Sequence, residues 1–248
     1  MTRRRSQHFG RNYLNSAGLF ERVLILLVIL VVIGVTIGLV LPRVSPKIAE
    51  MTGRYHATGT AAQTLAKLTV DDHPSTKGYG REKFGYRQTD ADGNGCDVRD
   101  DVLDRDLDDV RYTKRGGCKV QSGVLEDPYT GDKIRFQRGR NTSAAVQIDH
   151  VVALQNAWQS GANAWSAKKR YEFGNDMYNL IAVDGAANQE KSSASAAYWL
   201  PENSGYRCEY VARQIGVKDK YGLTVTTQEK RAMLGVLHSC PGQAVPEE

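Results

Sequence analysis

Two short polar segments of the chain carry side chains that could do chemistry together. The first is Asp149-His150, in an apolar stretch, and the second begins at Asn179. Asn188 follows Asn179 by nine positions, and Lys191 lies three positions further, about one helical turn away. A neutral imidazole accepts a proton from water near neutral pH, and carboxylate and amide oxygens are ligands for hard divalent cations. These residue types are therefore typical of metal-assisted hydrolysis.

Two strands and a helix must position these side chains. The apolar stretch 144–152 is strand-like as far as Asp149-His150 and leads into a helical region that continues to about residue 173. A short strand is expected over 180–183 and a helix over 185–198, with Asp184-Gly185 as the turn and helix N-cap between them. This strand–loop–strand–helix arrangement brings Asp149, His150 and the first turn of the helix together.

The spacing resembles the metal finger of the HNH, or His-Me finger, nucleases. That finger has an Asp-His or His-His pair, then Asn-Leu, then a His or Asn nine positions after that Asn, followed by x-x-Lys. The chain is similar, more closely, to the secreted HNH proteins related to the C-terminal domain of GmrSD-type restriction enzymes. This resemblance covers most of residues 71–240 and includes three further segments: Gly-Cys96-Asp97-Val-Arg99, Asp127-Pro-Tyr-Thr-Gly131 and Tyr206-Arg-Cys208-Glu-Tyr-Val-Ala-Arg213.

The resemblance implies an α+β fold with a ββα-metal core and a role for each residue of the pattern. His150 is the general base, and Asn179 orients its ring. Asp149 and Asn188 hold a divalent metal, Mg²⁺ before Mn²⁺, and leave most coordination sites to water and phosphate. Lys191 faces the phosphate from the same helix face. Many HNH fingers also carry a proline soon after the histidine and a C-x-x-C zinc scaffold, and this chain has neither.

The predicted function is a metal-dependent endonuclease that hydrolyses phosphodiester bonds of nucleic acid, DNA before RNA. We expect little sequence specificity, because no segment is typical of a helix that inserts into a groove. Two alternatives remain open. One is a non-catalytic nucleic-acid-binding or cell-surface protein that keeps the finger as a scaffold, and the other is a hydrolase of an envelope polymer. The sequence indicates no protein partner.

Two basic stretches could contact phosphates. Residues 77–87 interleave cations with aromatic residues, and residues 133–140 lead towards the strand that carries Asp149. Either stretch would look the same as a solvated strand face. We favour phosphate contact for the second stretch, through Arg138 and Arg140.

The acidic stretch 90–109 holds nine acids and two arginines, so we expect it to face away from nucleic acid. Its first part imitates a calcium loop, because Asp90, Asp92, Asn94 and Asp101 have nearly the required spacing. Cys96 takes the seventh position of that loop and no helix is expected before it. An Asp/Asn/Gly turn is therefore the favoured interpretation.

Residues 23–41 are nineteen uncharged, mostly aliphatic residues. A helix of this length spans roughly 28 Å, close to the hydrocarbon thickness of a bilayer. Leu39-Val40-Leu41-Pro42 offers no small-x-small cleavage site, which favours a retained transmembrane helix over a signal peptide. Five arginines precede the run, so the N-terminus is predicted to be cytoplasmic and the remainder extracytoplasmic in a bacterial cell, or secreted if the span is cleaved.

The four cysteines form no C-x-x-C pair, which argues against a zinc ribbon or a thioredoxin-type motif. An even number on the oxidising side of a membrane predicts two disulfides. Of the three connectivities, pairing of neighbours is the simplest, which gives Cys96–Cys118 and Cys208–Cys240. Four free buried thiols are the alternative.

Composition places most of the chain in a globular protein. Of its 248 residues, 25% are charged and 41% hydrophobic, which excludes a disordered, collagen-like or wholly membrane-embedded protein. The net charge is +5, but five arginines and one acid lie in residues 1–42, and the remaining 28 basic and 27 acidic residues nearly cancel. The positive charge therefore indicates the topology of an anchor and is no sign of a basic domain.

The predicted organisation has five parts: a cytoplasmic basic arm over 1–22, a transmembrane helix over 23–41, a linker over 42–57, one α+β nuclease domain over 58–242 and a flexible tail over 243–248. Within the domain, further helices are expected over 58–68, 98–110, 206–216 and 227–238, and strands near 118–124 and 133–138.

Overall fold

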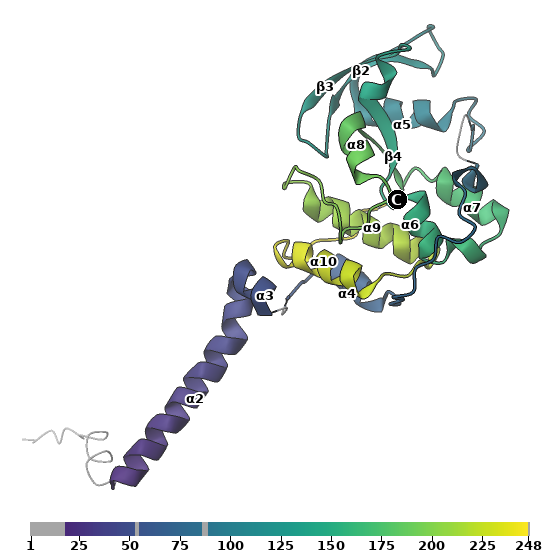
Figure 1. Ribbon diagram of the computed structural model, residues 1–248. Helices are drawn as coiled ribbons and strands as arrows, with labels where there is room; N and C mark the ends of the chain where they lie inside the picture. The colour runs from purple at the N-terminus through teal and green to yellow at the C-terminus, as the bar shows by residue number, and fades with distance from the viewer. Residues whose placement is uncertain (1–17, 53–54, 86–88, 248) are drawn as a thin grey trace, which may run out of the picture. The chain divides into compact units, whose positions relative to one another are not determined.

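The computed structural model describes residues 18–52, 55–85 and 89–247, and the chain divides into two compact units, residues 1–55 and 56–248 (Figure 1). Four of the arginines in the predicted basic arm, Arg3, Arg4, Arg5 and Arg11, lie outside the described residues.

The first unit contains a long apolar helix, α2 (Leu19–Val44), and a short one, α3 (Pro46–Thr52). α2 is long enough and apolar enough to cross a membrane, with a mean hydropathy of 3.4 over an 18-residue window. It extends beyond the predicted 23–41 at both ends. The predicted linker 42–57 is therefore partly helical, since α2 continues through Pro42 and α3 follows it directly.

The second unit is a mixed α+β domain. Its larger sheet is antiparallel, in the order β1 (Leu107–Tyr112), β2 (Val120–Glu126) and β3 (Lys133–Gln137). α5 (Val98–Asp106) precedes β1, and Asp97 caps it by accepting a hydrogen bond from the Arg99 amide at 2.8 Å. The predicted helix 98–110 is thus too long. Pairing of Leu107 with Leu125 draws the chain into the sheet, which overrides the local helical pattern.

The smaller sheet is the antiparallel pair β4 (Val146–His150) and β5 (Leu180–Asp184), in which His150 lies opposite Leu180. The segment between them forms α6 (Leu154–Gln159) and α7 (Ala167–Gly174). β5 leads directly into α8 (Gly185–Lys191), and the Asp184 carboxylate caps this helix as predicted, accepting from the Ala187 amide at 2.7 Å. α8 ends seven residues before the predicted 198, because Ser192 turns the chain with a φ of 49°.

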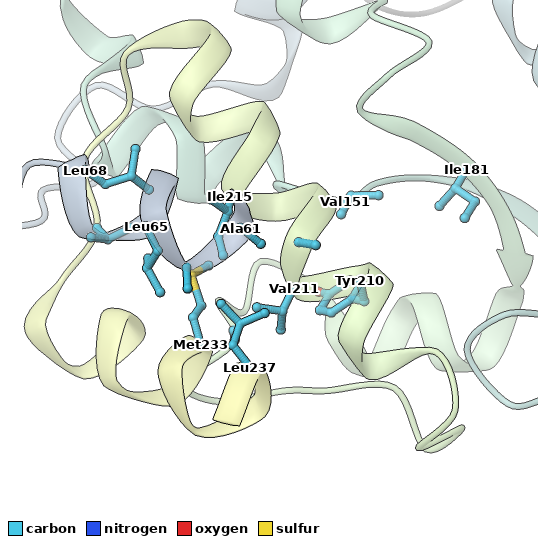
Figure 2. Packing of buried hydrophobic residues seen from close by; sticks show 14 of the residues in the cluster. Ala61, Leu65, Leu68, Val151, Ile181, Tyr210, Val211, Ile215, Met233 and Leu237 are labelled. Atoms are coloured by element: carbon cyan, nitrogen blue, oxygen red, sulfur yellow. The ribbon is translucent and has the colours of Figure 1, made fainter. Parts of the chain in front are cut away.

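Three helices pack together below β4 in the view of Figure 1: α4 (Thr60–Lys67), α9 (Arg207–Tyr221) and α10 (Thr227–His238). α9 runs five residues past its predicted end and stops at Gly222, which has a φ of 67°. Figure 2 shows how their apolar side chains meet, with Leu65, Val211 and Met233 in one cluster. Val151 and Ile181 belong to the same cluster, so the helices and the strand pair share a core.

Two disulfides close the domain at separate places. Cys96 pairs with Cys118 next to α5 and β2, and Cys208 pairs with Cys240, which joins α9 to the end of α10. The predicted pairing of neighbours is confirmed. In the chain-entropy model each bridge contributes roughly 3–4 kcal/mol by restricting the unfolded chain.

The predicted flexible tail differs from what the structure shows. Residues 243–247 run along α4, where the Gln243 carbonyl accepts from the Ala61 amide at 3.1 Å and Thr60 accepts from the Val245 amide at 3.0 Å. Tyr178 donates to the Pro246 carbonyl at 2.8 Å. These hydrogen bonds connect residues 243–247 to the rest of the domain.

Candidate active site

Asp149, His150 and Asn188 line one open pocket of about 470 Å³. The first two are the last residues of β4, and Asn188 lies in α8, one turn into the helix that follows β5. β4 and β5 pair over their whole length and α8 begins at once, so the strand pair and α8 bring these three residues to one pocket, which Tyr79 and Arg81 of a separate segment also line. The structure therefore brings to one pocket three of the five residues predicted for the site, and Asn179 and Lys191 are not among the residues that line it.

Asp149 lies in a buried network of charge and hydrogen bonds. Its Oδ2 is 2.8 Å from Lys191 Nζ and accepts a 2.6 Å hydrogen bond from the Tyr129 hydroxyl, while its Oδ1 accepts from Nζ at 3.0 Å. Burial and the neighbouring Asp149 carboxylate raise the pKa of Tyr129 well above its usual value, so the phenol stays protonated and remains a donor. Two donated hydrogen bonds and an ion pair thus fix a carboxylate that is only 5% exposed.

Lys191 occupies a different position from the one the sequence suggested. We expected its ammonium to face the phosphate of a substrate, but the side chain is fully buried. Besides the ion pair with Asp149, Nζ donates to the His150 carbonyl at 2.9 Å. Its positive charge therefore compensates the negative charge of Asp149. The ammonium contacts protein groups and is not placed to contact a substrate phosphate.

His150 has its ring held by a backbone carbonyl. Nε2 lies 2.8 Å from the oxygen of Gly174, the last residue of α7. A carbonyl only accepts, so Nε2 carries the proton and the lone pair of the neutral ring is on Nδ1. Burial lowers the pKa of His150 to about 4, although the bond to Gly174 and the Asp149 charge oppose the shift. The imidazole is therefore neutral at physiological pH.

Asn179 stabilises the chain that follows the histidine. Its Oδ1 accepts from the Val152 amide at 2.8 Å, and its Nδ2 donates to the Val152 carbonyl at 3.2 Å. The Asn179 carbonyl also accepts from the Val151 amide at 2.8 Å. We expected Asn179 to fix the ring of His150, but that contact belongs to Gly174. Asn179 instead holds the turn that begins at the end of β4.

Asn188 has its amide group oriented by Gln147, another residue of β4. Its Nδ2 donates to Gln147 Oε1 at 3.0 Å. The amide oxygen of Asn188 is therefore the side-chain atom that can bind another ligand. Both residues line the pocket. The two predicted oxygen donors, Asp149 and Asn188, therefore line the same pocket.

The basic residue at this pocket comes from the stretch that we did not favour. Arg81 is exposed and lines the pocket together with Tyr79. Arg138 instead donates to the buried Asp100 carboxylate and to the Val120 carbonyl, and Arg140 is exposed on the β3–β4 connection. Neither Arg138 nor Arg140 lines the pocket.

The acidic segment that imitates a calcium loop uses its side chains for turn hydrogen bonds. Asp90 accepts from the Gly93 amide at 2.8 Å and from the Gly95 amide at 2.9 Å, and Asp92 accepts from the Asn94 amide at 3.1 Å. These contacts are those of an Asp/Asn/Gly turn.

Sequence reasoning missed Tyr129, Gly174 and Arg81 as residues of the site. Tyr129 did carry a signal, since it lies in the Asp127-Pro-Tyr-Thr-Gly131 segment. Gly174 carried none, because a helix-terminal carbonyl can belong to any residue type.

The donor set fits a hard divalent cation that has few protein ligands. An ionised carboxylate has about four lone-pair sites, so Asp149 keeps acceptor capacity beyond its present partners. Among the described residues, no group of three or more His, Cys, Asp or Glu side chains is placed to hold a metal. A structural zinc cage is therefore not available there, whereas Mg²⁺ keeps several waters and binds through one or two protein oxygens.

Comparisons with known proteins assign the chain to a family. The model for "GmrSD restriction endonucleases, C-terminal domain" matches residues 97–236. An uncharacterized secreted protein of Arthroderma benhamiae is 37% identical over 186 residues, which cover 74% of this chain and 86% of that protein. No solved structure matches. The chain belongs to the family of GmrSD restriction endonuclease C-terminal domains, as its motifs indicated.

We expect Tyr129→Phe to lower the free energy of unfolding by about 1.5–3 kcal/mol, because it removes a buried hydrogen bond to a charged group and keeps the ring. Urea unfolding of the full chain, followed by tryptophan fluorescence, measures the change, since all three tryptophans lie in residues 56–248. Tyr112→Phe is the matched control, because its hydroxyl bonds to Asp104 on the surface. Equal losses in the two variants would contradict a special role of the Asp149 network.

Proposed function

We propose that this protein is a metal-dependent nuclease of the HNH type that hydrolyses phosphodiester bonds of nucleic acid, DNA before RNA. The observation that carries the proposal is the grouping of Asp149, His150 and Asn188 on one open pocket, with the histidine tautomer set by Gly174. Membership of a restriction-endonuclease family supports a nuclease-related function and this class of substrate.

In this mechanism His150 is the general base. Nδ1 takes a proton from the attacking water, and the Nε2–H bond to the Gly174 carbonyl stabilises the imidazolium that forms. Because its pKa is about 4, the ring is neutral at physiological pH, and the lone pair that takes the proton is on Nδ1. Asn179 holds the turn after His150 through its hydrogen bonds to Val152, and this keeps the His150 ring at the pocket.

Asp149 and Asn188 are the residues that hold the divalent metal. When bound there, the metal supplies Lewis-acid stabilisation of the scissile phosphate and of the leaving 3′ oxygen. Lys191 and Tyr129 fix the carboxylate, and Gln147 orients the amide. Arg81 adds a positive charge at the same pocket, where it attracts the phosphate.

The charges of the site favour joint binding of metal and nucleic acid. The negative charge of Asp149 is compensated by Lys191, and Asn188 is neutral. The protein alone therefore offers a divalent cation little net attraction. A nucleic-acid phosphate at the pocket supplies the missing negative charge, so metal affinity is expected to rise when substrate is present.

We propose that α2 anchors the domain in the membrane, with the N-terminus in the cytoplasm and the domain outside. Its hydropathy and the two disulfides support this, because disulfides persist in oxidising compartments. A signal sequence has the same apolar character, and the Arthroderma benhamiae relative is described as secreted. Recovery of the intact chain from the membrane fraction on an immunoblot is expected, whereas a shortened chain in the medium would favour cleavage.

His150→Ala is expected to lower the rate of plasmid cleavage by at least about a hundredfold, because general-base catalysis contributes roughly 10²–10⁴ in rate. The assay incubates the full chain in detergent with plasmid DNA or RNA and Mg²⁺, and then with a chelator, which should abolish cleavage. His73→Ala is the control, because that side chain is 94% exposed. Wild-type cleavage by His150→Ala would refute the mechanism, and no cleavage by wild type would favour a binding protein.

Asn188→Asp is expected to tighten Mn²⁺ binding roughly tenfold, because it gives the site a second carboxylate. Electron paramagnetic resonance of free Mn²⁺ measures the affinity without relying on catalysis. Asn188→Ala should weaken binding, and Asn175→Asp is a control, because that buried residue lies outside the pocket. If all three variants bind Mn²⁺ like wild type, Asn188 is not a metal ligand.

A further inference from the structure

A second pocket, of about 460 Å³, adjoins the candidate active site. The two pockets share Gln155 of α6 and the residues Ser192 and Ser193 that follow α8. Lys191, whose ammonium contacts Asp149, also lines the second pocket. The two hollows therefore lie on either side of the end of α8, and a chain-like ligand can occupy both.

The second pocket has the wrong charge for a phosphate. Of its charged lining residues, Lys191 and Glu229 are buried and paired with Asp149 and Lys218. The exposed ones, Asp71 and Glu190, are both acidic. An anionic group is repelled here and attracted by Arg81 in the first pocket.

Amide side chains dominate one wall of the second pocket. Gln155, Asn156 and Gln159 all come from α6 and line it. Within the described part of the chain, no residue forms a hydrogen bond with any of these three side chains. Each amide offers both donors and an acceptor, which is the combination that pairs with the edge of a nucleobase.

An exposed aromatic ring completes the second pocket. Tyr198 is 74% exposed, far more than Tyr112 and Tyr171, the other exposed tyrosines among the described residues of the domain. Its hydroxyl donates to Gln228 Oε1 of α10 at 3.0 Å, which restrains the ring. Unpaired bases stack on aromatic side chains placed in this way.

The backbone between the pockets is in an unusual conformation. Ser192 has a φ of 49° and a ψ of −120°, and Asp109 is the other non-glycine residue with positive φ among those described. A non-glycine residue in such a region is strained, and such residues cluster at functional sites. The strained turn is what directs the chain from the first pocket into the wall of the second.

From these observations we infer that the second pocket binds an unpaired nucleobase of the strand whose phosphate lies in the candidate active site. The base stacks on Tyr198 and its edge pairs with the α6 amides, while the adjoining phosphate is near Arg81. This inference rests on the proposed nuclease function and deepens it, because it selects single-stranded or locally unpaired nucleic acid as the substrate.

The test measures binding of a fluorescein-labelled DNA dodecamer, single-stranded or in a duplex, to the full chain in detergent with EDTA. Tyr198→Ala is expected to weaken single-strand binding at least about fivefold, the lower end of what stacking of one base contributes. Tyr198→Phe keeps the ring and should bind like wild type. Duplex binding should be weaker and unchanged by Tyr198→Ala.

Tyr112→Ala is the matched control, because it removes an exposed tyrosine on β1 that lines neither pocket. Unchanged single-strand binding in Tyr198→Ala, or an equal loss in Tyr112→Ala, overturns the inference. Displacement of the dodecamer by micromolar N-acetylchitohexaose would also overturn it, because it would assign the pocket to a polysaccharide.

Cleavage assays with Mg²⁺ separate this inference from the proposed function. If wild type cleaves DNA and Tyr198→Ala binds single strands normally, the base pocket is wrong and the nuclease stands. If wild type cleaves no nucleic acid and Tyr198→Ala still loses single-strand binding, the nuclease is wrong and the base pocket stands.

Discussion

The candidate site depends on the buried ion pair between Asp149 at the end of β4 and Lys191 at the end of α8. Taking either charge out of water costs several kcal/mol, so each residue needs the other. Because Lys191 is the last residue of α8, the pair fixes where that helix ends relative to β4. Asn188, one turn earlier, is thereby held on the same pocket, and the chain must then turn sharply at Ser192. One electrostatic contact thus sets the positions of both oxygen donors.

Polar side chains from the larger sheet and α5 hold the other strand of the site. Arg105 donates to the Leu180 carbonyl at 2.7 Å, and Asp106 accepts from the Ala182 amide at 2.7 Å. Asp127 accepts from the Asp184 amide at 2.8 Å, just before α8 begins. These bonds satisfy the free edge of β5, which would otherwise expose unpaired backbone groups. The acidic stretch that contains α5 therefore contributes to the architecture beneath the site.

Local patterns in the sequence were enough to predict the elements that carry the site and three of the residues that line its pocket, Asp149, His150 and Asn188. The strand that ends at Asp149-His150, the strand that follows Asn179 and the helix cap at Asp184 are each indicated by residues close to them in the sequence. Partners from distant segments had no such signal. Three contacts depend on how distant segments meet in the folded chain. They are the hydrogen bond between His150 and the Gly174 carbonyl, the ion pair of Lys191 with Asp149 and the ion pair of Arg138 with Asp100. The ends of α5 and α8 were misjudged for the same reason.

The near-neutral charge of the domain bears on how it can act on a polyanion. Non-specific binding through many phosphate contacts requires a broad basic surface, which the 25 basic and 26 acidic residues of 56–248 do not readily provide. The first pocket instead has a single arginine, Arg81, beside Asp149 and Asn188, and the second offers amides and an aromatic ring. Affinity from stacking and base edges depends less on salt than affinity from phosphate contacts. This distribution of charge is therefore better suited to binding a nucleic acid whose bases are accessible than to binding a duplex through its phosphates.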